Sequence, residues 1–453
     1  MPMVGADSRA AHLYGMATDA PHFLQRQARA HGPFVRLRLG RGEVVLVTDP
    51  AATRLVLVDE HAFPKGPGVG MAGGSTGESP LKAVLGNGLL TSKGEHHKRQ
   101  RRLIQPAFHH ERIASYAGVM AVEADAVAAT WSDGDVVDLH ATFAETTLRI
   151  LTRTIFSSDL SAAESATVRD AMRSTMRGPG ANVILVAASR RFGQRAMASR
   201  RKALAGIDAL ITRLISSHTD GHDVLSWLLT AQDDETGHPM SDQDVRDELL
   251  TLLLAGHETS TNALSWAYYL LSQHPEAAGA LHAELDDVLA GRLPTVEDLA
   301  NLHYTRAVVD EAMRLYPPAW ILLRHAEADA TIAGHAITGG TTILMSPFVT
   351  HRDPTLWSDA DRFDPSRWLT GPAGAYSPTP PTRHAYFPFG GGPRMCIGNT
   401  FALMEIAIVL ATTSVSWRPE ARKRSIGMTP RVTLRPRGGM PMTVRRRRVA
   451  VTR

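Results

Sequence analysis

The chain has 453 residues, of which 43% are hydrophobic and 21% are charged, and its net charge is +4. This composition is typical of a globular protein with a large core. The single cysteine excludes an intrachain disulfide and is typical of a reducing cytoplasm. The terminal run of arginines is interpreted as a solvated tail, because no nucleic-acid motif accompanies it. No linker or repeat divides the sequence, so one domain over residues 1–453 is expected.

The N-terminal part predicts a small β-rich region. Residues 1–30 carry charged and histidine side chains, so we expect neither a signal-peptide core nor a membrane anchor there. Residues 34–39 alternate in polarity and residues 43–48 form an apolar run, which indicates a hairpin. Asp49-Pro50 then marks the start of a helix. Residues 63–88 form a connection long enough to be functional.

Two basic positions follow this loop. His97 and Arg101 lie one helical turn apart on one face of a predicted helix. Taken alone, they indicate a solvated basic helix end. Further on, residues 111–219 alternate amphipathic helical stretches and break at Gly178-Pro179-Gly180.

A long central helix is predicted from Ser241 to His274-Pro275, with an N-cap followed by acidic residues in the first turn. It contains the polar insert Ala255-Gly256-His257-Glu258-Thr259-Ser260. A glycine inside a helix costs about 1 kcal/mol against alanine, and a buried acid needs a partner. The insert is therefore either a kink whose hydroxyls bond to preceding carbonyls or a functional site.

Beyond this helix, Glu311 and Arg314 share a helix face, and the apolar stretch 319–323 ends at Arg324. Short strands at 331–345 are expected to pair with the N-terminal hairpin, which joins residues 32–60 to residues 330–350. A last hairpin is predicted at 425–434.

The only cysteine lies in the glycine-rich stretch Phe389-Gly390-Gly391-Gly392-Pro393-Arg394-Met395-Cys396-Ile397-Gly398. An apolar helix is predicted directly after it. Free amides and the helix dipole at this point lower a cysteine pKa and favour the thiolate, which binds soft metals or attacks electrophiles. A buried structural thiol is the alternative interpretation.

The spacing Phe-x-x-Gly-x-Arg-x-Cys-x-Gly resembles the haem-binding loop of the cytochrome P-450 family, and the other motifs follow in the family's order. The resemblance implies a mainly helical α+β fold with a small β subdomain. Haem b would lie between the central helix and the helix after the cysteine. Cys396 would be the axial ligand, and its thiolate would favour O–O cleavage.

The resemblance also implies roles for other residues. Phe389 would shield the sulfur, and the partners of the haem propionates would be His97, Arg101, Arg324 and Arg394. Ala255 and Gly256 would leave room for haem and oxygen. Glu258 and Thr259 would form an acid-alcohol pair that guides protons, a contribution of about 10²- to 10⁴-fold per group. The residues expected to form a buried structural triad are Glu311, Arg314 and Arg362.

The expected function is that of a cytoplasmic, monomeric haem-thiolate monooxygenase that inserts one atom of O2 into an apolar small molecule. The resemblance implies that residues 319–323 line the substrate pocket and that residues 426–428 of the last hairpin face the substrate. The segment Tyr316-Pro317-Pro318-Ala319-Trp320 resembles actinobacterial members that oxidise terpenes, so a sesquiterpene-like substrate is predicted. Electrons would come from a ferredoxin and its reductase, because no flavin or nicotinamide motif is present. The residues expected to form a basic docking surface are Lys98, Arg99 and Arg102.

Several alternatives remain open at this point. The substrate could be a fatty acid, a macrolide or a steroid. The protein could use peroxide instead of O2, although the acid-alcohol pair favours oxygen activation. It could also be a haem-based sensor or carrier without turnover, which product formation would exclude. A cysteine hydrolase is the remaining alternative, and it predicts no bound haem.

Overall fold

The computed structural model describes residues 9–39, 44–66, 82–176, 205–219, 221 and 223–447. The predicted break at Gly178-Pro179-Gly180, which the family resemblance places in a lid over the distal pocket, and most of the long loop after Phe63 lie outside these residues. The last six residues, which include Arg448, lie outside them as well.

Helix α12 (Asp242–Gln273) runs through the middle of the helical part. Ser241 Oγ accepts from Asp244 N, and the Asp244 carboxylate accepts from Ser241 N, so both ends of the predicted cap are satisfied. The helix ends at His274, where Pro275 starts the next helix. The predicted bounds of the central helix are therefore confirmed.

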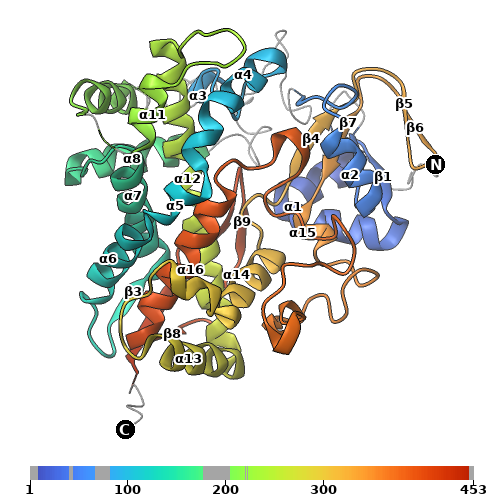
Figure 1. The fold of residues 1–453 in the computed structure, drawn as a ribbon. Helices are drawn as coiled ribbons and strands as arrows, with labels where there is room; N and C mark the ends of the chain where they lie inside the picture. Colours follow the sequence, from blue (N-terminus) through green and yellow to red (C-terminus); the bar gives the residue numbers. More distant parts are fainter. Residues whose placement is uncertain are drawn as a thin grey trace, which may run out of the picture.

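Most of the helices pack against α12 or α16, which meet in the largest hydrophobic cluster, whereas α1 packs against α15 and β1 (Phe34–Leu37). In Figure 1, α16 crosses the middle of the molecule while α6, α7, α8 and α11 form one side. The α-helical bounds are α1 (Arg9–His31), α2 (Pro50–Val58), α3 (Lys82–Leu85), α4 (Gly94–Ile104), α5 (His110–Ala114), α6 (Ala117–Ala128), α7 (Leu139–Ile155), α8 (Ala162–Met176), α11 (Val224–Thr230), α13 (Pro275–Leu289), α14 (His303–Leu315), α15 (Pro347–Thr350) and α16 (Asn399–Ser416). The 3-10 helices are η1 (Gln105–Phe108), η2 (Glu297–Ala300), η3 (Pro365–Trp368), η4 (Pro372–Gly374) and η5 (Gly392–Arg394).

Helix α16 is long and apolar enough to cross a membrane by composition alone. However, 72% of its apolar window is buried inside the protein. It packs against α6, α12 and α14, so it is a core helix of the fold.

The main sheet has the strand order β1-β2-β7-β4. Its strands are β1 (Phe34–Leu37), β2 (Val44–Val47), β4 (Leu322–His325) and β7 (Thr342–Met345). The N-terminal hairpin joins the distant part of the chain through β2 and β7, which run parallel from Val44↔Thr342 to Val47↔Met345. Helices α1 and α2 lie beside this sheet (Figure 1).

Three small sheets complete the β structure. Their strands are β3 (Val136–Asp138), β8 (Trp417–Ala421) and β11 (Pro441–Arg446) in one sheet, β5 (Ala330–Ile332) and β6 (His335–Ile337) in another, and β9 (Met428–Pro430) and β10 (Leu434–Pro436) in the third. The β9-β10 hairpin is anchored by two indoles. Trp266 Nε1 donates to Leu434 O at 3.0 Å, and Trp320 Nε1 donates to Arg431 O at 2.9 Å.

The predicted charged triad contains a different arginine from the one expected. Glu311 and Arg314 are fully buried and form a two-bond ion pair at 2.8 Å. The third guanidinium is that of Arg367, whose Nε lies 3.0 Å from Glu311 Oε1. Arg362 contributes only its carbonyl oxygen, which accepts from Arg314 at 2.9 Å. The expectation for Arg362 was wrong, because the 3-10 turn η3 directs Arg367 toward the carboxylate.

Candidate active site

Glycines shape the cysteine loop. Three N–H groups of the loop donate to carbonyl oxygens of the same loop at 3.0 Å: Gly390 to Phe387, Met395 to Gly392 and Cys396 to Phe389. Gly392 has φ +65°, and a Cβ there would lie 2.1 Å from Leu57 O. Only glycine fits at 392, where the loop passes close to the end of α2.

Cys396 lies just before α16, whose N-cap is Gly398. Burial raises the pKa of the Cys396 thiol, while the Gly398 backbone and the Arg101 guanidinium lower it. The residue nevertheless keeps accessible surface. Because Cys396 is surrounded by protein and yet accessible, we infer that it borders an enclosed space. The prediction of a lowered pKa was wrong, because burial outweighs the helix terminus. A metal ion bound by the sulfur would stabilise the thiolate.

Five basic side chains gather beside this loop: Lys65, His97, Arg101, Arg324 and Arg394. Burial, followed by the charge of Arg394, lowers the pKa of Lys65 to about 7, of His97 to about 4 and of Arg324 to about 10. The pKa values of Arg101 and Arg394 are also lowered, chiefly by burial.

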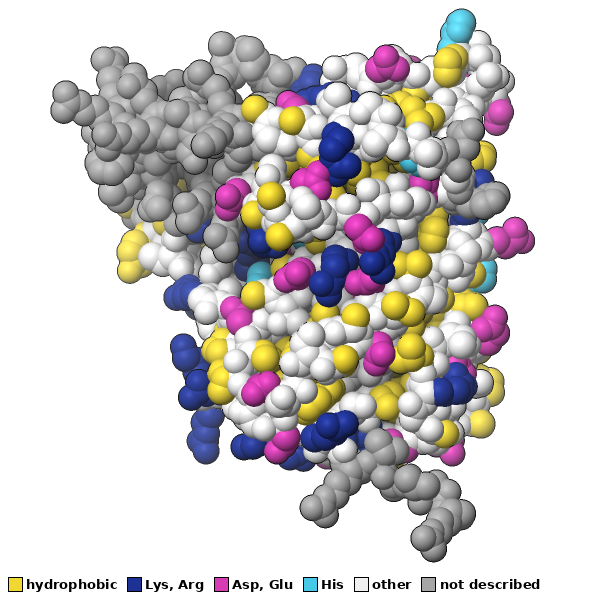
Figure 2. Space-filling view, turned by 90° about the vertical axis from the view of Figure 1, so that its left-hand side faces the viewer, with side chains coloured by type: hydrophobic (Ala, Val, Ile, Leu, Met, Phe, Trp, Pro, Cys, Tyr) yellow, Lys and Arg dark blue, Asp and Glu magenta, His cyan; other side chains and the backbone are white. Residues whose placement is uncertain are grey.

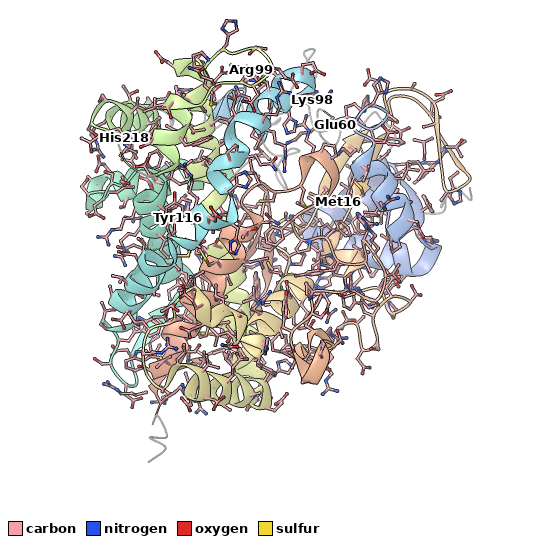
Figure 3. The ribbon with its side chains drawn as sticks, viewed as in Figure 1. Met16, Glu60, Lys98, Arg99, Tyr116 and His218 are labelled. Carbon is pink, nitrogen blue, oxygen red and sulfur yellow. The ribbon has the colours of Figure 1, made fainter. Side chains whose placement is uncertain are left out.

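This cluster has few anionic partners. Among the described residues, Glu60 is the carboxylate that bonds to it, through Arg394 Nε (Figure 3). Arg101 and Arg324 donate to the backbone oxygens of Met395 and Leu323, at 2.8 and 3.0 Å. The buried atoms Arg394 Nη2 and His97 Nδ1 have no protein partner. The cluster is therefore suited to a ligand with more than one negative charge.

Four of these five residues were predicted from the sequence, and the structure brings them together from α4, β4 and the cysteine loop. Lys65 and its neighbour Glu60 were missed. Lys65 follows Phe63-Pro64 in an irregular segment, where no periodicity points to the loop near Cys396. Lys65 is recognised only by its position in the folded protein, where burial and then the charges of Arg394 and Arg324 lower its pKa.

On α12, Ala255, Gly256 and Thr259 keep partial exposure in the middle of a helix whose following residues are buried. Thr259 Oγ1 donates to Ala255 O at 3.0 Å and to Gly256 O at 3.2 Å. A Cβ at Gly256 would lie 3.0 Å from Leu151 Cδ1 of α7. Gly256 thus permits close packing of α7, a role that the sequence did not predict.

Glu258 points away from Thr259 toward the C-terminal hairpin. Its Oε1 accepts from Arg435 Nε at 2.5 Å and from Thr433 Oγ1. Its Oε2 is buried without a protein partner. The acid and the alcohol are neighbours in sequence, but in this structure each is bonded to a different part of the protein.

The predicted pocket segment divides into two parts. Trp320 is only 5% exposed, packs in the cluster with Phe23 and Leu24, and bonds to the hairpin backbone. Its indole is therefore part of the core, against expectation. Leu322 is half-buried, and its Cδ1 lies 3.7 Å from the place of a Cβ at Gly390, so it adjoins the cysteine loop.

The last predicted substrate contact, at residues 426–428, is also divided. Ile426 is buried in the core, and Gly427 O accepts from Arg437 N at 2.7 Å. Met428 stays half-buried between two hydrophobic clusters.

The predicted basic surface on α4 is largely neutralised. Lys98 pairs with Glu95 at 2.7 Å (Figure 3). Arg99 lies between Asp233 and Asp244, at 3.6 and 3.7 Å. Arg102 pairs with Asp233 and with Glu235. Arg99 and Arg102 hold α4 to the first turn of α12 and the segment before it, while Lys98 is paired within α4, so the three do not form the free basic surface that was expected.

A cysteine in a glycine loop, placed before a core helix and beside a cluster of buried cations, is the arrangement of a haem-thiolate site. Haem b has an iron for the sulfur and two propionates for the cations, and the partnerless Arg394 Nη2 and His97 Nδ1 fit such acceptors. The family model described as cytochrome P450 matches residues 10–438. The chain therefore belongs to the cytochrome P450 family, and it is a haem b-dependent monooxygenase.

Relatives cover nearly the whole chain. Cyclooctatin synthase of Streptomyces melanosporofaciens is 39% identical over 96% of this chain and 91% of its own. Cyclooctat-9-en-7-ol 5-monooxygenase of the same organism is 38% identical over 86% and 83%. Pentalenene oxygenase of Streptomyces avermitilis is 34% identical over 94% and 92%.

The fold comparison agrees with the sequence comparison. The crystal structure of the cytochrome P450DA heme domain matches with a TM-score of 0.83 and 26% identity. The match covers 97% of this chain and 96% of that one. The predicted fold class, family and haem cofactor are thus confirmed.

Proposed function

We propose that this P450 hydroxylates a cyclic terpene, either a sesquiterpene-like hydrocarbon or a larger cyclic alkenol. The observation that carries the proposal is the 34–39% identity, over most of the chain, to three oxygenating relatives. Two of their names denote a cyclic alkenol and an alkene as the compound oxidised. The half-buried apolar side chains of Leu322, Leu323 and Met428 are compatible with such a skeleton.

The haem supplies the reduction of O2 and the transfer of one oxygen atom when it is bound. The protein's own part begins with Cys396, which would hold the iron as a thiolate. The charges of Arg101, Arg324, Arg394 and Lys65 would neutralise the propionates. His97, whose pKa is lowered to about 4, would donate a hydrogen bond to them. Ala255 and Thr259 would face the reacting region, and Glu258 would hold the proton that the reaction consumes.

We propose a ferredoxin as the electron donor, docking on a basic patch around the cysteine loop. Exposed Arg54 and Arg383 both lower the pKa of His384, although burial lowers it most. His384 Nε2 lies 3.7 Å from the place of a Cβ at Gly391. No described carboxylate pairs with Arg54 or Arg383 within 4.0 Å. This patch has free charge for an acidic donor, which the paired residues of α4 lack.

The face formed by α6, α7 and α8 offers a contrast. Basic and acidic side chains are interspersed there (Figure 2). Glu123 of α6 pairs with both Arg149 and Arg153 of α7. A surface whose charges are paired within the protein gives little electrostatic steering.

A spectral titration tests the substrate class. The ferric protein would be titrated with cyclic sesquiterpenes, cyclic alkenols, fatty acids and a macrolide while the spin state of the haem is followed. A saturable shift with a cyclic terpene is expected. A shift with fatty acids alone would overturn the proposal.

A further inference from the structure

The C-terminal hairpin reaches into the helical core at Glu258. Thr433 lies in the turn between β9 and β10, and Arg435 lies on β10. Both side chains donate to the same oxygen, Glu258 Oε1. Glu258 is 3% exposed, whereas the Arg435 side chain is 23% exposed. The ion pair therefore extends from the interior of α12 to the solvent.

Within the described part of the chain, few other charged groups surround this pair. His140 Nε2 of α7 lies 3.1 Å from Asn262 Oδ1, one turn along α12 from Glu258. Burial and then Arg435 lower the pKa of His140, while Asp138 and Glu258 raise it. Burial also lowers the pKa of His257, the residue before Glu258. Arg435 is thus the cation that directly bonds to this carboxylate.

The two oxygens of Glu258 have different environments. Oε1 is held by the hairpin, and Oε2 is buried with no partner among the described residues. An unpaired oxygen of a buried carboxylate is unfavourable unless a water or a reacting group completes it. Oε2 is therefore the atom at which a proton can be taken up, while Oε1 stays fixed.

We propose that Arg435 is a positioning residue for proton delivery: it holds Glu258 by Oε1 and links it to solvent, so that Oε2 carries the proton. This inference rests on the proposed proton-holding role of Glu258. Arg435, on the β9-β10 hairpin, would thereby affect turnover without itself contacting the substrate. Thr433 shares the task through a neutral hydrogen bond.

The matched control is Arg437 on the same hairpin. Its guanidinium donates to Met428 O at 3.0 Å, whereas the described partners of Glu258 are Thr433 and Arg435. The variants R435L, R435K, T433V, R437L and E258Q would be compared as holoenzymes. Haem content and the reduced carbon-monoxide spectrum would establish that each one is folded.

The first readout is product formed per NADPH consumed, with hydrogen peroxide measured alongside, using a compound that shifts the spin state. R435L is expected to lower this ratio about tenfold, which is less than the roughly 10²- to 10⁴-fold contribution of a general acid-base group, because Arg435 only positions that group. T433V should lower it less, R435K should restore part of it, and R437L should match the wild type. Should R435L fail to fold, T433V and R435K still decide, because unchanged coupling in both would overturn the proposal.

The second readout does not depend on turnover. In a double-mutant cycle of thermal unfolding, R435L should lower Tm less in the E258Q background than in the wild type, because the ion pair is already lost. R437L should lower Tm equally in both backgrounds. Additive effects of R435L and E258Q would contradict the pairing.

The reference variant E258Q separates the two claims. If E258Q loses coupling and R435L does not, Arg435 has no positioning role while the role of Glu258 stands. If E258Q couples like the wild type, the proposed role of Glu258 fails as well.

Discussion

Glu60 holds one side of the Arg394 guanidinium and leaves the other side without a protein partner. Arg394 Nε donates to the Glu60 carboxylate, Nη1 donates to Ser92 O at 2.7 Å, and Nη2 is buried and unpaired. The guanidinium is thus fixed in place before any ligand binds. We expect such preorganisation to favour retention of the haem, because little side-chain order remains to be gained.

Lys65 should make haem retention depend on pH. Its pKa of about 7 rises when a propionate binds. Below pH 7 Lys65 is already charged before binding, so its contribution to haem affinity is complete there. Above pH 7 Lys65 must take up a proton when haem binds, and its contribution to haem affinity falls by up to about tenfold per pH unit. We expect K65M to release haem faster than the wild type at pH 6, with the difference shrinking toward pH 9.

This pH effect is measured as haem transfer from the holoenzyme to an acceptor protein. Cys396 also titrates on binding, but it does so in both proteins, so the ratio of wild type to K65M isolates Lys65. A ratio that stays constant from pH 6 to pH 9 would rule out the linkage.

The charged cluster at Glu311 predicts unequal effects of two nearby arginines. R367A leaves a buried carboxylate short of a partner and should lower the free energy of unfolding by about 3 kcal/mol. R362A removes an exposed side chain and should change it by less than about 0.5 kcal/mol. Urea unfolding of both variants checks this, and the reverse order would restore the arginine expected from sequence.

Gly392 should tolerate no side chain. A Cβ there would meet a backbone oxygen at 2.1 Å, whereas Gly340, with φ +87°, has no atom within 4 Å of the same place. G340A should cost about 1–3 kcal/mol from its φ alone. G392A should in addition displace the cysteine loop and reduce haem content severalfold. Equal haem content in the two purified variants would show that the loop can shift.

Arg54 and Arg383 should govern reduction by a ferredoxin. The double reversal R54E/R383E is expected to slow the second-order reduction rate about tenfold at low salt, with the difference vanishing near 1 M salt. K423E is the control, because Lys423 is exposed and follows β8, a strand that lies at the opposite end of the molecule from α4 in Figure 1. Stopped-flow reduction measures both, and equal slowing by K423E would argue against a local docking patch.

Much of the site follows from local sequence. The only cysteine, the glycines before it and the apolar helix after it lie within one stretch, and His97 and Arg101 share a helix face. The cap at Ser241 also depends on residues three apart. Such features are readable because the chain itself sets their spacing.

The remainder depends on tertiary contacts. Glu258 meets Arg435, 177 residues away, and no local pattern encodes that pairing. Trp320 has a large apolar side chain of the kind that lines pockets. However, its indole N–H donates to Arg431 O, and the ring packs into the core. Arg367, and not Arg362, contacts Glu311 through its side chain, because the 3-10 turn η3 determines which of the two side chains faces the carboxylate.

The most direct test of the proposed function is turnover of a cyclic terpene under ¹⁸O-labelled O2, with a ferredoxin and its reductase as electron source. Mass spectrometry should find a product that contains one labelled oxygen atom and is absent with the C396A variant. If fatty acids or macrolides gain the labelled oxygen and no cyclic terpene does, the proposed substrate class is wrong.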